Sequence, residues 1–204
     1  MKPDQIEALS FEIIEKEAGP HSFALDQWRI VQRMIHTTAD FEFLKNTCFH
    51  PGAVEAGLSA IRQGKTIITD TNMAKAGIRK KELKLFGVNV RCFIDDPEVK
   101  KHSIQNRTTR AEEAVDIAVP IMNGGIYVVG NAPTALLRII KLVNEKKVKP
   151  ALIIGLPVGF VNAAESKAKL IKMDYPYISN RGRKGGSNVA ASVVNALTRL
   201  VIKG

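Results

Sequence analysis

The chain has 204 residues, of which 45% are hydrophobic, 25% charged and 6% aromatic. These proportions are typical of a soluble globular protein and exclude a disordered chain, and no apolar run approaches the length of a membrane span. We expect one domain over residues 1–204, long enough to bury a sizeable core. The acidic N-terminus lacks the basic and apolar regions of a signal peptide, so we expect a cytoplasmic protein that binds no membrane.

The whole net charge of +10 lies in the last third of the chain. Residues 138–204 carry thirteen Lys and Arg against three acids, whereas residues 1–137 carry seventeen of each. Such a surface suits a nucleic acid, an anionic membrane or a small polyanion. Residues 181–188 stand out because their glycines let backbone N–H groups approach a ligand closely. The remaining lysines are interpreted as solvated helix faces: Lys146, Lys147, Lys149, Lys167, Lys169 and Lys172.

Hydrophobic periodicity predicts helices over residues 3–17 and 24–38 and a third after Pro51. Capping patterns predict further helices: Thr109 with Glu112, Asn162 with Glu165, and Pro133 in a first turn. Strands are predicted at 66–69, 88–94, 126–129 and 151–154, with a weaker candidate near 175–178. The alternation predicts a single-domain, three-layer α/β/α fold with a mainly parallel, doubly wound sheet.

In a doubly wound sheet, ligands bind beyond the carboxyl ends of the strands. The unusual sequences of this chain fall there: residues 70–73, 130–134, 157–162 and the glycine-rich loop 182–187. Turn and capping chemistry explains each segment alone, but their convergence on one edge would form a ligand site. A P-loop, a G-x-G-x-x-G fingerprint and a G-x-S-x-G elbow are all missing from the sequence.

One segment carries acid–base chemistry. At helical spacing, Arg33, His36 and Asp40 share one side of a helix. Histidine titrates near neutral pH and can give or take a proton. Asp40 either orients His36 or only solvates the helix end, and the second interpretation is the simpler one. Cys48 and Cys92 are isolated thiols, expected to be reduced, and no metal site is expected.

Eight motifs follow one another along nearly the whole chain. They are Ser10-Phe11-Glu12-Ile13-Ile14, Arg33-Met34-Ile35-His36, Thr69-Asp70-Thr71-Asn72-Met73, Ile94-Asp95-Asp96-Pro97-Glu98-Val99, Thr109-Arg110-Ala111, residues 129–136, residues 157–161 with 165–167, and residues 182–187. As a set in this order they are specific, and the chain resembles a known family, the precorrin-8X (cobalt-precorrin-8) methylmutases of cobalamin biosynthesis.

The resemblance implies a flavodoxin-like fold, a homodimer and an isomerase that moves a methyl group from C-11 to C-12 of a corrinoid ring, giving hydrogenobyrinate or cobyrinate. The family's catalytic histidine matches His36, and its substrate-contacting positions match Ser10 and Arg33. Further substrate contacts are expected from the loops at the sheet edge: Thr71, Asn131, Arg183, Lys184, Gly186 and Ser187. No cofactor is expected, since any cobalt would be carried by the tetrapyrrole substrate.

The chemistry agrees with the residues. An intramolecular 1,5-sigmatropic shift needs one acid and no external nucleophile, and a positioned acid contributes about 10²–10⁴-fold. A polycarboxylate substrate explains the basic C-terminal third without nucleic acid, whose binding would need aromatic residues interleaved with Lys and Arg. The alternative function for the same fold is an enzyme that binds a nucleotide or phosphate ligand, with loop 182–187 holding the phosphate.

Overall fold

The computed structural model describes residues 2–203, and its centre is one six-stranded sheet in the order β1-β6-β5-β4-β2-β3. Strands β2 to β6 are parallel, and β1 adds to β6 as an antiparallel edge, with Thr47 opposite Asn180. The five parallel strands have the flavodoxin-like order, so the predicted doubly wound sheet is confirmed. The strands are β1 (Thr47–Phe49), β2 (Ile67–Thr69), β3 (Val90–Cys92), β4 (Ile126–Val129), β5 (Leu152–Gly155) and β6 (Tyr177–Asn180).

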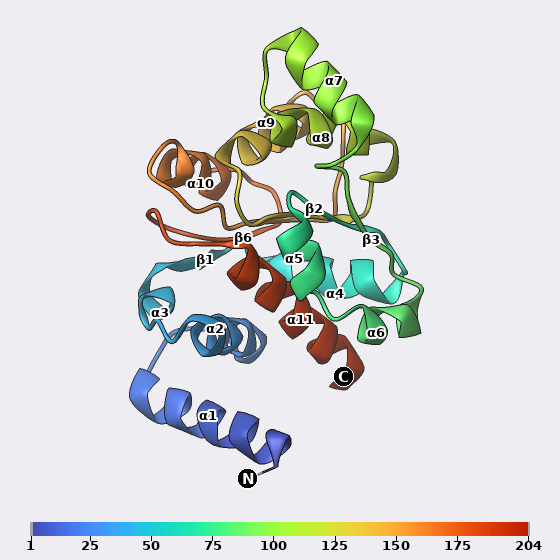
Figure 1. The fold of residues 1–204 in the computed structure, drawn as a ribbon. Coiled ribbons are helices and arrows are strands. Elements are labelled where there is room, and N and C mark those ends of the chain that lie inside the picture. The colour runs from blue at the N-terminus through green and yellow to red at the C-terminus, as the bar shows by residue number, and fades with distance from the viewer. Residues whose placement is uncertain (1, 204) are drawn as a thin grey trace.

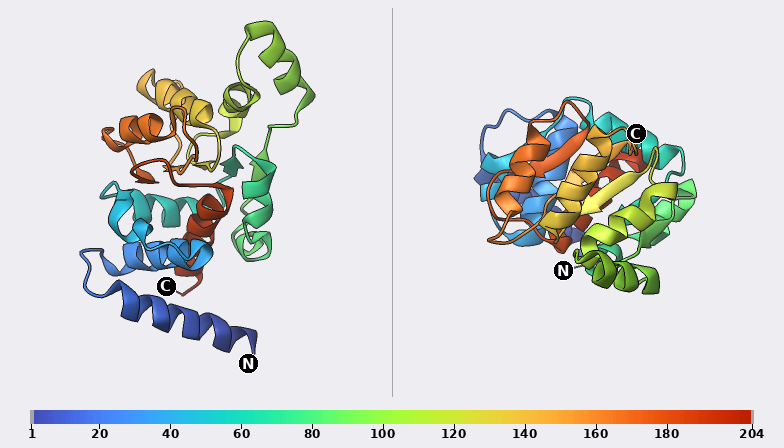
Figure 2. Two further views of the ribbon diagram at one scale, coloured as in Figure 1. Left: turned by 60° about the vertical axis from the view of Figure 1, so that its left-hand side comes forward. Right: turned by 90° about the horizontal axis from the view of Figure 1, so that it is seen from above.

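Helices cover both faces of the sheet and complete the three layers (Figure 1). On one face α8, α9 and α10 pack side by side, with α7 outside α8; on the other, α11 packs against α2, α4 and α5, with α1 outside α2 (Figure 2). The helices are α1 (Pro3–Ala18), α2 (Leu25–Thr38), α3 (Glu42–Asn46), α4 (Ala53–Arg62), α5 (Asn72–Gly77), α6 (Lys80–Leu83), α7 (Pro97–Asn106), α8 (Arg110–Ala118), α9 (Pro133–Asn144), α10 (Ala163–Ile171) and α11 (Ser187–Lys203), with 3₁₀ turns η1 (Lys84–Phe86) and η2 (Val119–Ile121).

The core consists of two apolar clusters, one on each face of the sheet. Along β4, Ile126 and Val128 belong to the cluster under α11, while Tyr127 and Val129 belong to the cluster under α9. This alternation follows from the two-residue repeat of a strand. All four β4 side chains are buried, as expected for a central strand covered on both faces. Each such apolar side chain contributes about 1.5–3 kcal/mol through burial.

Most predicted elements lie within a few residues of their observed bounds, and β1 is the strand that the sequence patterns miss. It has three residues, and its partner β6 follows some 130 residues later, so no local pattern announces the pairing. Thr109 caps α8 by accepting from the Glu112 N–H at 3.2 Å, which is the N-cap half of the capping box expected there, and Pro133 begins α9 as predicted. The capping box at Asn162 is wrong, because its left-handed backbone (φ 60°) differs from the extended cap conformation and its side chain makes no cap bond.

Within residues 2–203, no helix has the length and apolar character that crossing a bilayer requires.

Candidate active site

The carboxyl ends of β2 and β4 form the switch point of the sheet, because the chain leaves β2 toward β3 on one side and β4 toward β5 on the other. Asp70 follows β2 and is 1% exposed. Its carboxylate accepts from the N–H groups of Gly130 at 2.9 Å and of Asn131 and Ala132 at 2.8 Å each. Burial raises the pKa of Asp70, and these N–H groups oppose the shift. The protein's own carboxylate therefore fills the anion position at the start of α9.

Two further predicted residues meet beside this switch point. The Thr71 and Ser187 hydroxyls lie 2.8 Å apart, joining the start of α5 to the start of α11. Gly130 allows this approach, since a Cβ there would lie 2.7 Å from the Ser187 Cα. Asn131 lies on the same edge with an exposed side chain, but Asp70 already takes its N–H. Only the Asn131 side chain is therefore free to contact a ligand.

The glycine-rich loop with its preceding arginine, residues 181–187, is called the basic loop below and crosses the carboxyl end of β5. The Gly186 N–H donates to the Leu156 carbonyl at 2.9 Å, and a Cβ at Gly185 would lie 2.3 Å from the same oxygen. Close packing against the strand end thus explains the glycine at 185. Gly186 has φ +134°, a conformation that other residues rarely adopt, so it too is fixed by the backbone path.

Lys167 holds this loop from beneath and is 0% exposed, so its interpretation as a solvated lysine is wrong. Its ammonium donates to Asn180 Oδ1 at 3.1 Å and to the Lys184 carbonyl at 2.5 Å. Burial lowers its pKa to about 8. Helical spacing from the buried Ala163 and Leu170 would have placed Lys167 on the inner face of α10.

The Lys184 side chain joins the loop to the end of α2. Its ammonium lies 2.5 Å from Asp40 Oδ2 and 3.1 Å from Glu42 Oε2, and its hydrogen bond to Asp40 lowers the pKa of that carboxyl. Among residues 2–203, no hydrogen bond joins Asp40 to His36. Asp40 therefore anchors the basic loop four residues beyond His36, a role that neither interpretation of its sequence position included.

An exposed aromatic side chain lies against an arginine of the loop. Phe160, which follows β5, is 83% exposed, and the Arg183 guanidinium lies 5.4 Å from its ring centroid. Val161 and Met73 are 78% and 72% exposed. Single exposed apolar residues need no explanation, but two adjacent ones beside an arginine offer a surface to a ligand with an apolar body and negative charges.

His36 lies at the exposed end of α2, with its ring stacked on Phe11 of α1 at 5.0 Å between centroids. The Arg33 guanidinium lies 4.5 Å from the centroid of the same Phe11 ring. Ser10 precedes Phe11 on α1, and its hydroxyl donates to the Ile6 carbonyl at 2.8 Å. Ser10, Arg33 and His36 thus lie on the packed pair α1 and α2, apart from Thr71 and Ser187, and the Lys184–Asp40 ion pair connects the two groups.

The partly exposed Glu7 carboxylate organises the arginines beside His36. Glu7 accepts from Arg33 at 2.5 Å and from Arg199 of α11 at 3.0 and 3.1 Å, and the two arginines lower its pKa to about 2. Neither Glu7 nor Arg199 is among the residues that the sequence motifs indicate. Helical spacing between Glu7 and Phe11 gave a weak signal for the first, but no local pattern relates Arg199 to Arg33.

The electrostatic surroundings of His36 favour its neutral form. Partial burial is the main cause of a pKa below the ordinary value of 6.5, and the nearby positive charges of Arg33 and Arg199 add to it. Glu7 opposes the shift. At neutral pH the imidazole of the free protein is therefore uncharged, and a second carboxylate arriving beside it would raise its pKa.

Both cysteines are free thiols, and burial raises the pKa of each, so they stay protonated. Within the described part of the chain, no three His, Cys, Asp or Glu side chains are grouped so as to hold a metal ion.

Comparisons with known proteins cover nearly the whole chain. The sequence profile of the Precorrin-8X methylmutase family matches residues 5–200. The chain is 46% identical to Cobalt-precorrin-8 methylmutase of Priestia megaterium over 204 residues, which are 100% of this chain and 91% of the relative. It is 45% identical to the protein of the same name from Salmonella typhimurium, with 96% and 94% covered.

A solved structure agrees with these sequence matches. The crystal structure of precorrin-8X methyl mutase from Thermus thermophilus superposes with a TM-score of 0.91 at 44% identity, covering 98% of this chain and 97% of that one. Profile, relatives and structure give the same assignment. The chain therefore belongs to the precorrin-8X methylmutase family and is an isomerase of cobalamin biosynthesis.

Proposed function

We propose that this chain moves the methyl group at C-11 of precorrin-8X or cobalt-precorrin-8 to C-12, giving hydrogenobyrinate or cobyrinate, with His36 as the proton donor and acceptor. The observation that carries the proposal is the position of His36, exposed beside Arg33 and four residues from the ion pair that anchors the basic loop. An acid–base group thus adjoins several cations, as a polycarboxylate substrate requires. Any cobalt is part of the substrate, and the reaction asks for no cofactor from the protein.

The reaction is an isomerisation, so its atoms balance within the ring. The C-11 to methyl bond breaks as the C-12 to methyl bond forms, and no group leaves. A proton given by His36 to a ring nitrogen makes the macrocycle electron-poor beside the migrating methyl group, and the same proton returns to His36 afterwards. Catalysis then needs one proton, held at one imidazole nitrogen.

Substrate binding favours the protonated form of His36. In the free protein the positive charges of Arg33 and Arg199 disfavour the imidazolium. Substrate carboxylates beside Arg33 offset those charges and raise the pKa of His36. The acid is therefore formed when substrate is bound, and the empty site keeps a neutral histidine.

The remaining candidate residues have side chains suited to binding the carboxylates at the edge of the substrate ring. Arg33 already holds a carboxylate, that of Glu7, in a charge-assisted hydrogen bond, which is the geometry it would use for substrate. Arg183 and Lys184 supply further cations, and Ser10, Thr71, Asn131 and Ser187 supply hydroxyl and amide groups. Gly186 shapes the loop. The phosphate alternative, in which loop 182–187 would hold phosphate, is disfavoured because the Gly186 N–H of that loop already donates to the Leu156 carbonyl at 2.9 Å.

The proposal is tested by turnover of cobalt-precorrin-8 and of its metal-free counterpart with wild type, His36→Ala and the matched control His102→Ala on α7. A ¹³C label in the migrating methyl group, followed by NMR, reports the bond change directly. We expect His36→Ala to keep its fold and product binding but to lose about 10²–10⁴-fold in rate. The control keeps the wild-type rate. A His36→Ala rate within a few-fold of wild type would remove His36 from the mechanism.

We also propose a homodimer, supported by the outer side of α1. Ile6, Leu9 and Ile13 share one side of this helix and are 53%, 44% and 47% exposed, facing away from α2. A second copy of the chain would cover this stripe. Light scattering after gel filtration tests it: Leu9→Asp should give monomers, while Leu85→Asp, at a residue 74% exposed on η1, should leave the dimer intact. A monomeric wild-type protein would refute the dimer.

A further inference from the structure

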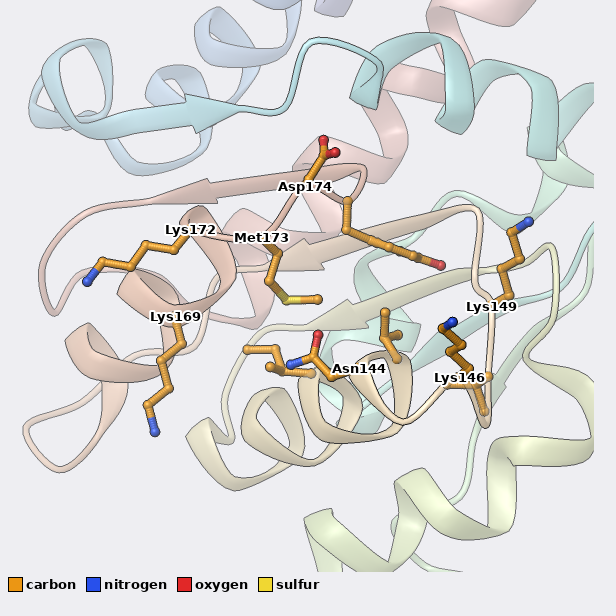
Figure 3. Close-up of a pocket in the computed structure, with 11 residues that line it drawn as sticks. Asn144, Lys146, Lys149, Lys169, Lys172, Met173 and Asp174 are labelled. Atoms are coloured by element: carbon orange, nitrogen blue, oxygen red, sulfur yellow. The ribbon is translucent and has the colours of Figure 1, made fainter.

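A hollow lies at the amino edge of the sheet, opposite the edge that carries Thr71 and Ser187. It forms where α9 and α10 end and where the chain turns back into β5 and β6, and its volume is about 870 Å³ (Figure 3). The length of the parallel strands separates it from the candidate active site. A ligand in this hollow would therefore be distinct from the substrate undergoing the methyl shift.

The floor of the hollow is apolar and firmly held. Ile140 and Val148 are buried core residues, and Val143, Met173 and Tyr175 complete the lining. The Tyr175 hydroxyl donates to the Pro150 carbonyl, which fixes its ring as a wall. Covering this apolar surface with the apolar body of a ligand lowers the free energy, because both surfaces leave water.

Four lysines flank this floor in two pairs. Figure 3 shows Lys169 and Lys172 on one side, Lys146 and Lys149 on the other, and Met173 and Asn144 between them. All four lysines are exposed, and within residues 2–203 none of their ammonium groups has a carboxylate within 4.0 Å. The neighbouring Lys147 shows the contrast, since it pairs with Glu145 at 2.8 Å.

Negative charge around the hollow does not neutralise these lysines. Asp174 is the acidic residue in the lining, and its carboxylate contacts His50 at 3.2 Å instead. Lys146 also keeps a left-handed backbone (φ 56°), where glycine would be unstrained. The hollow thus presents positive charges on either side of an apolar centre, and lysines without carboxylate partners around one hollow favour an anionic occupant.

We propose that this hollow binds a second polycarboxylated tetrapyrrole, a flat apolar ring with carboxylates at separated positions on its edge. The ring would lie on the apolar floor and its carboxylates would reach the lysine pairs on both sides. A nucleotide carries its charge at one end and a fatty acid carries a single charge, so neither engages both pairs. The ring class rests on the proposed function, whereas the requirement for separated anions rests on the lysines alone.

Methionine methyl groups can locate such a ligand, because the two edges of the sheet each carry one. Met173 lines the hollow, Met73 lies exposed at the carboxyl edge, and the buried Met34 and Met122 serve as internal references. The probe is metal-free coproporphyrin III, a tetracarboxylate whose ring current shifts nearby resonances. In protein labelled with [methyl-¹³C]methionine, we expect a saturable shift of Met173 on titration.

Charge variants test what holds the probe. We expect the Met173 titration to weaken about tenfold when Lys146, Lys149, Lys169 and Lys172 are all changed to Gln. The matched control changes the same number of exposed lysines elsewhere to Gln, at Lys80, Lys81, Lys84 and Lys100, and should stay within twofold of wild type. If the fourfold variant fails to fold, the two pairs are changed separately, each with an expected loss of about threefold.

Three results would overturn the proposal. These are an unmoved Met173 resonance, equal weakening in the pocket and control variants, and a Met173 response to hexaglutamate but not to the porphyrin, which would assign the hollow to an acidic protein segment. The proposed function fails separately, through loss of the His36 dependence of turnover. A Met173 shift in a protein whose turnover ignores His36 would therefore keep the hollow and reject the mechanism.

Discussion

The Lys184 ammonium lies 2.5 Å from the Asp40 carboxylate, and this contact joins the basic loop to the end of the helix that carries His36. The Lys184 side chain thus fixes the position of the basic loop relative to His36, which lies on α2. Both partners are partly exposed, so the contact is open to screening by salt and to competition from a ligand carboxylate.

The basic loop should bind product in a salt-dependent manner. We expect the double variant Arg183→Ala, Lys184→Ala to bind cobyrinate more weakly than wild type at low salt, and to lose part of the salt dependence, because two partly exposed cations are removed. Calorimetric titration at low and high salt measures both effects. The control is Lys80→Ala, Lys81→Ala, which removes the same charge on α6. Parallel curves for the double variant and wild type would place the loop outside the site.

The Glu7 carboxylate should compete with substrate for Arg33. Changing Glu7 to Gln removes the internal partner of both arginines, so product affinity should rise while the free energy of unfolding falls. The pKa of Glu7 is lowered from 4.5 to about 2, so its stabilising contribution is present above pH 4.5 and is lost as pH falls toward 2. After allowance for solvent screening, we expect the Glu7 carboxylate to contribute about 1–3 kcal/mol to the free energy of unfolding at neutral pH. Urea unfolding from pH 7 to pH 2 measures this.

A neutral control separates the two effects of Glu7. Glu12 lies on the same helix, and Glu12→Gln should leave product affinity unchanged. If Glu7→Gln lowered product affinity, Glu7 would support Arg33 in binding and would not compete with the substrate.

The pKa of His36 should depend on Arg33. In the free protein it lies below 6.5, so the imidazolium is lost as pH rises through that lowered value. Arg33→Met removes a positive charge and should raise the pKa, as NMR titration of the ring would show. With bound cobyrinate the pKa of the wild-type protein should also rise. As pH rises, kcat/KM, which reports the free enzyme, should therefore fall at a lower pH than kcat, which reports the complex. Coincident pH profiles would contradict the proposal that substrate binding raises the pKa of His36.

The sequence predicts the sheet and the edge at which the polar loops gather, because strand periodicity, caps and turn residues are local signals. Lys167 shows how residue type can mislead, because helical spacing from Ala163 and Leu170 places it on the inner face of α10, whereas its charge favours the interpretation as solvated. Asp70 shows a second limit. Its motif predicted a ligand-binding turn, but its carboxylate meets backbone N–H groups 60 residues away. Such pairings follow from topology, which no short window of sequence encodes.

The pH dependence of stability should reveal the buried Lys167. Its folded pKa of about 8 is below the model-compound value of 10.5, so above pH 8 the folded state binds fewer protons than the unfolded state. Stability therefore rises with pH between about 8 and 10.5, by about 3 kcal/mol at 1.4 kcal/mol per pKa unit. Lys167→Met should remove this rise. It also leaves Asn180 Oδ1 and the Lys184 carbonyl without that donor, a cost of about 1–3 kcal/mol at neutral pH.

The same variant tests whether Lys167 positions the basic loop. Because its ammonium holds the Lys184 carbonyl, Lys167→Met should raise KM for substrate more than it lowers kcat, and should weaken the salt dependence of product binding. Lys147→Met, at an exposed lysine paired with Glu145, is the control for loss of one charge. Chemical denaturation between pH 7 and pH 10.5 and steady-state kinetics on both variants provide the measurements. A Lys167→Met protein with the wild-type pH slope and unchanged KM would show that the loop keeps its place without this buried ammonium.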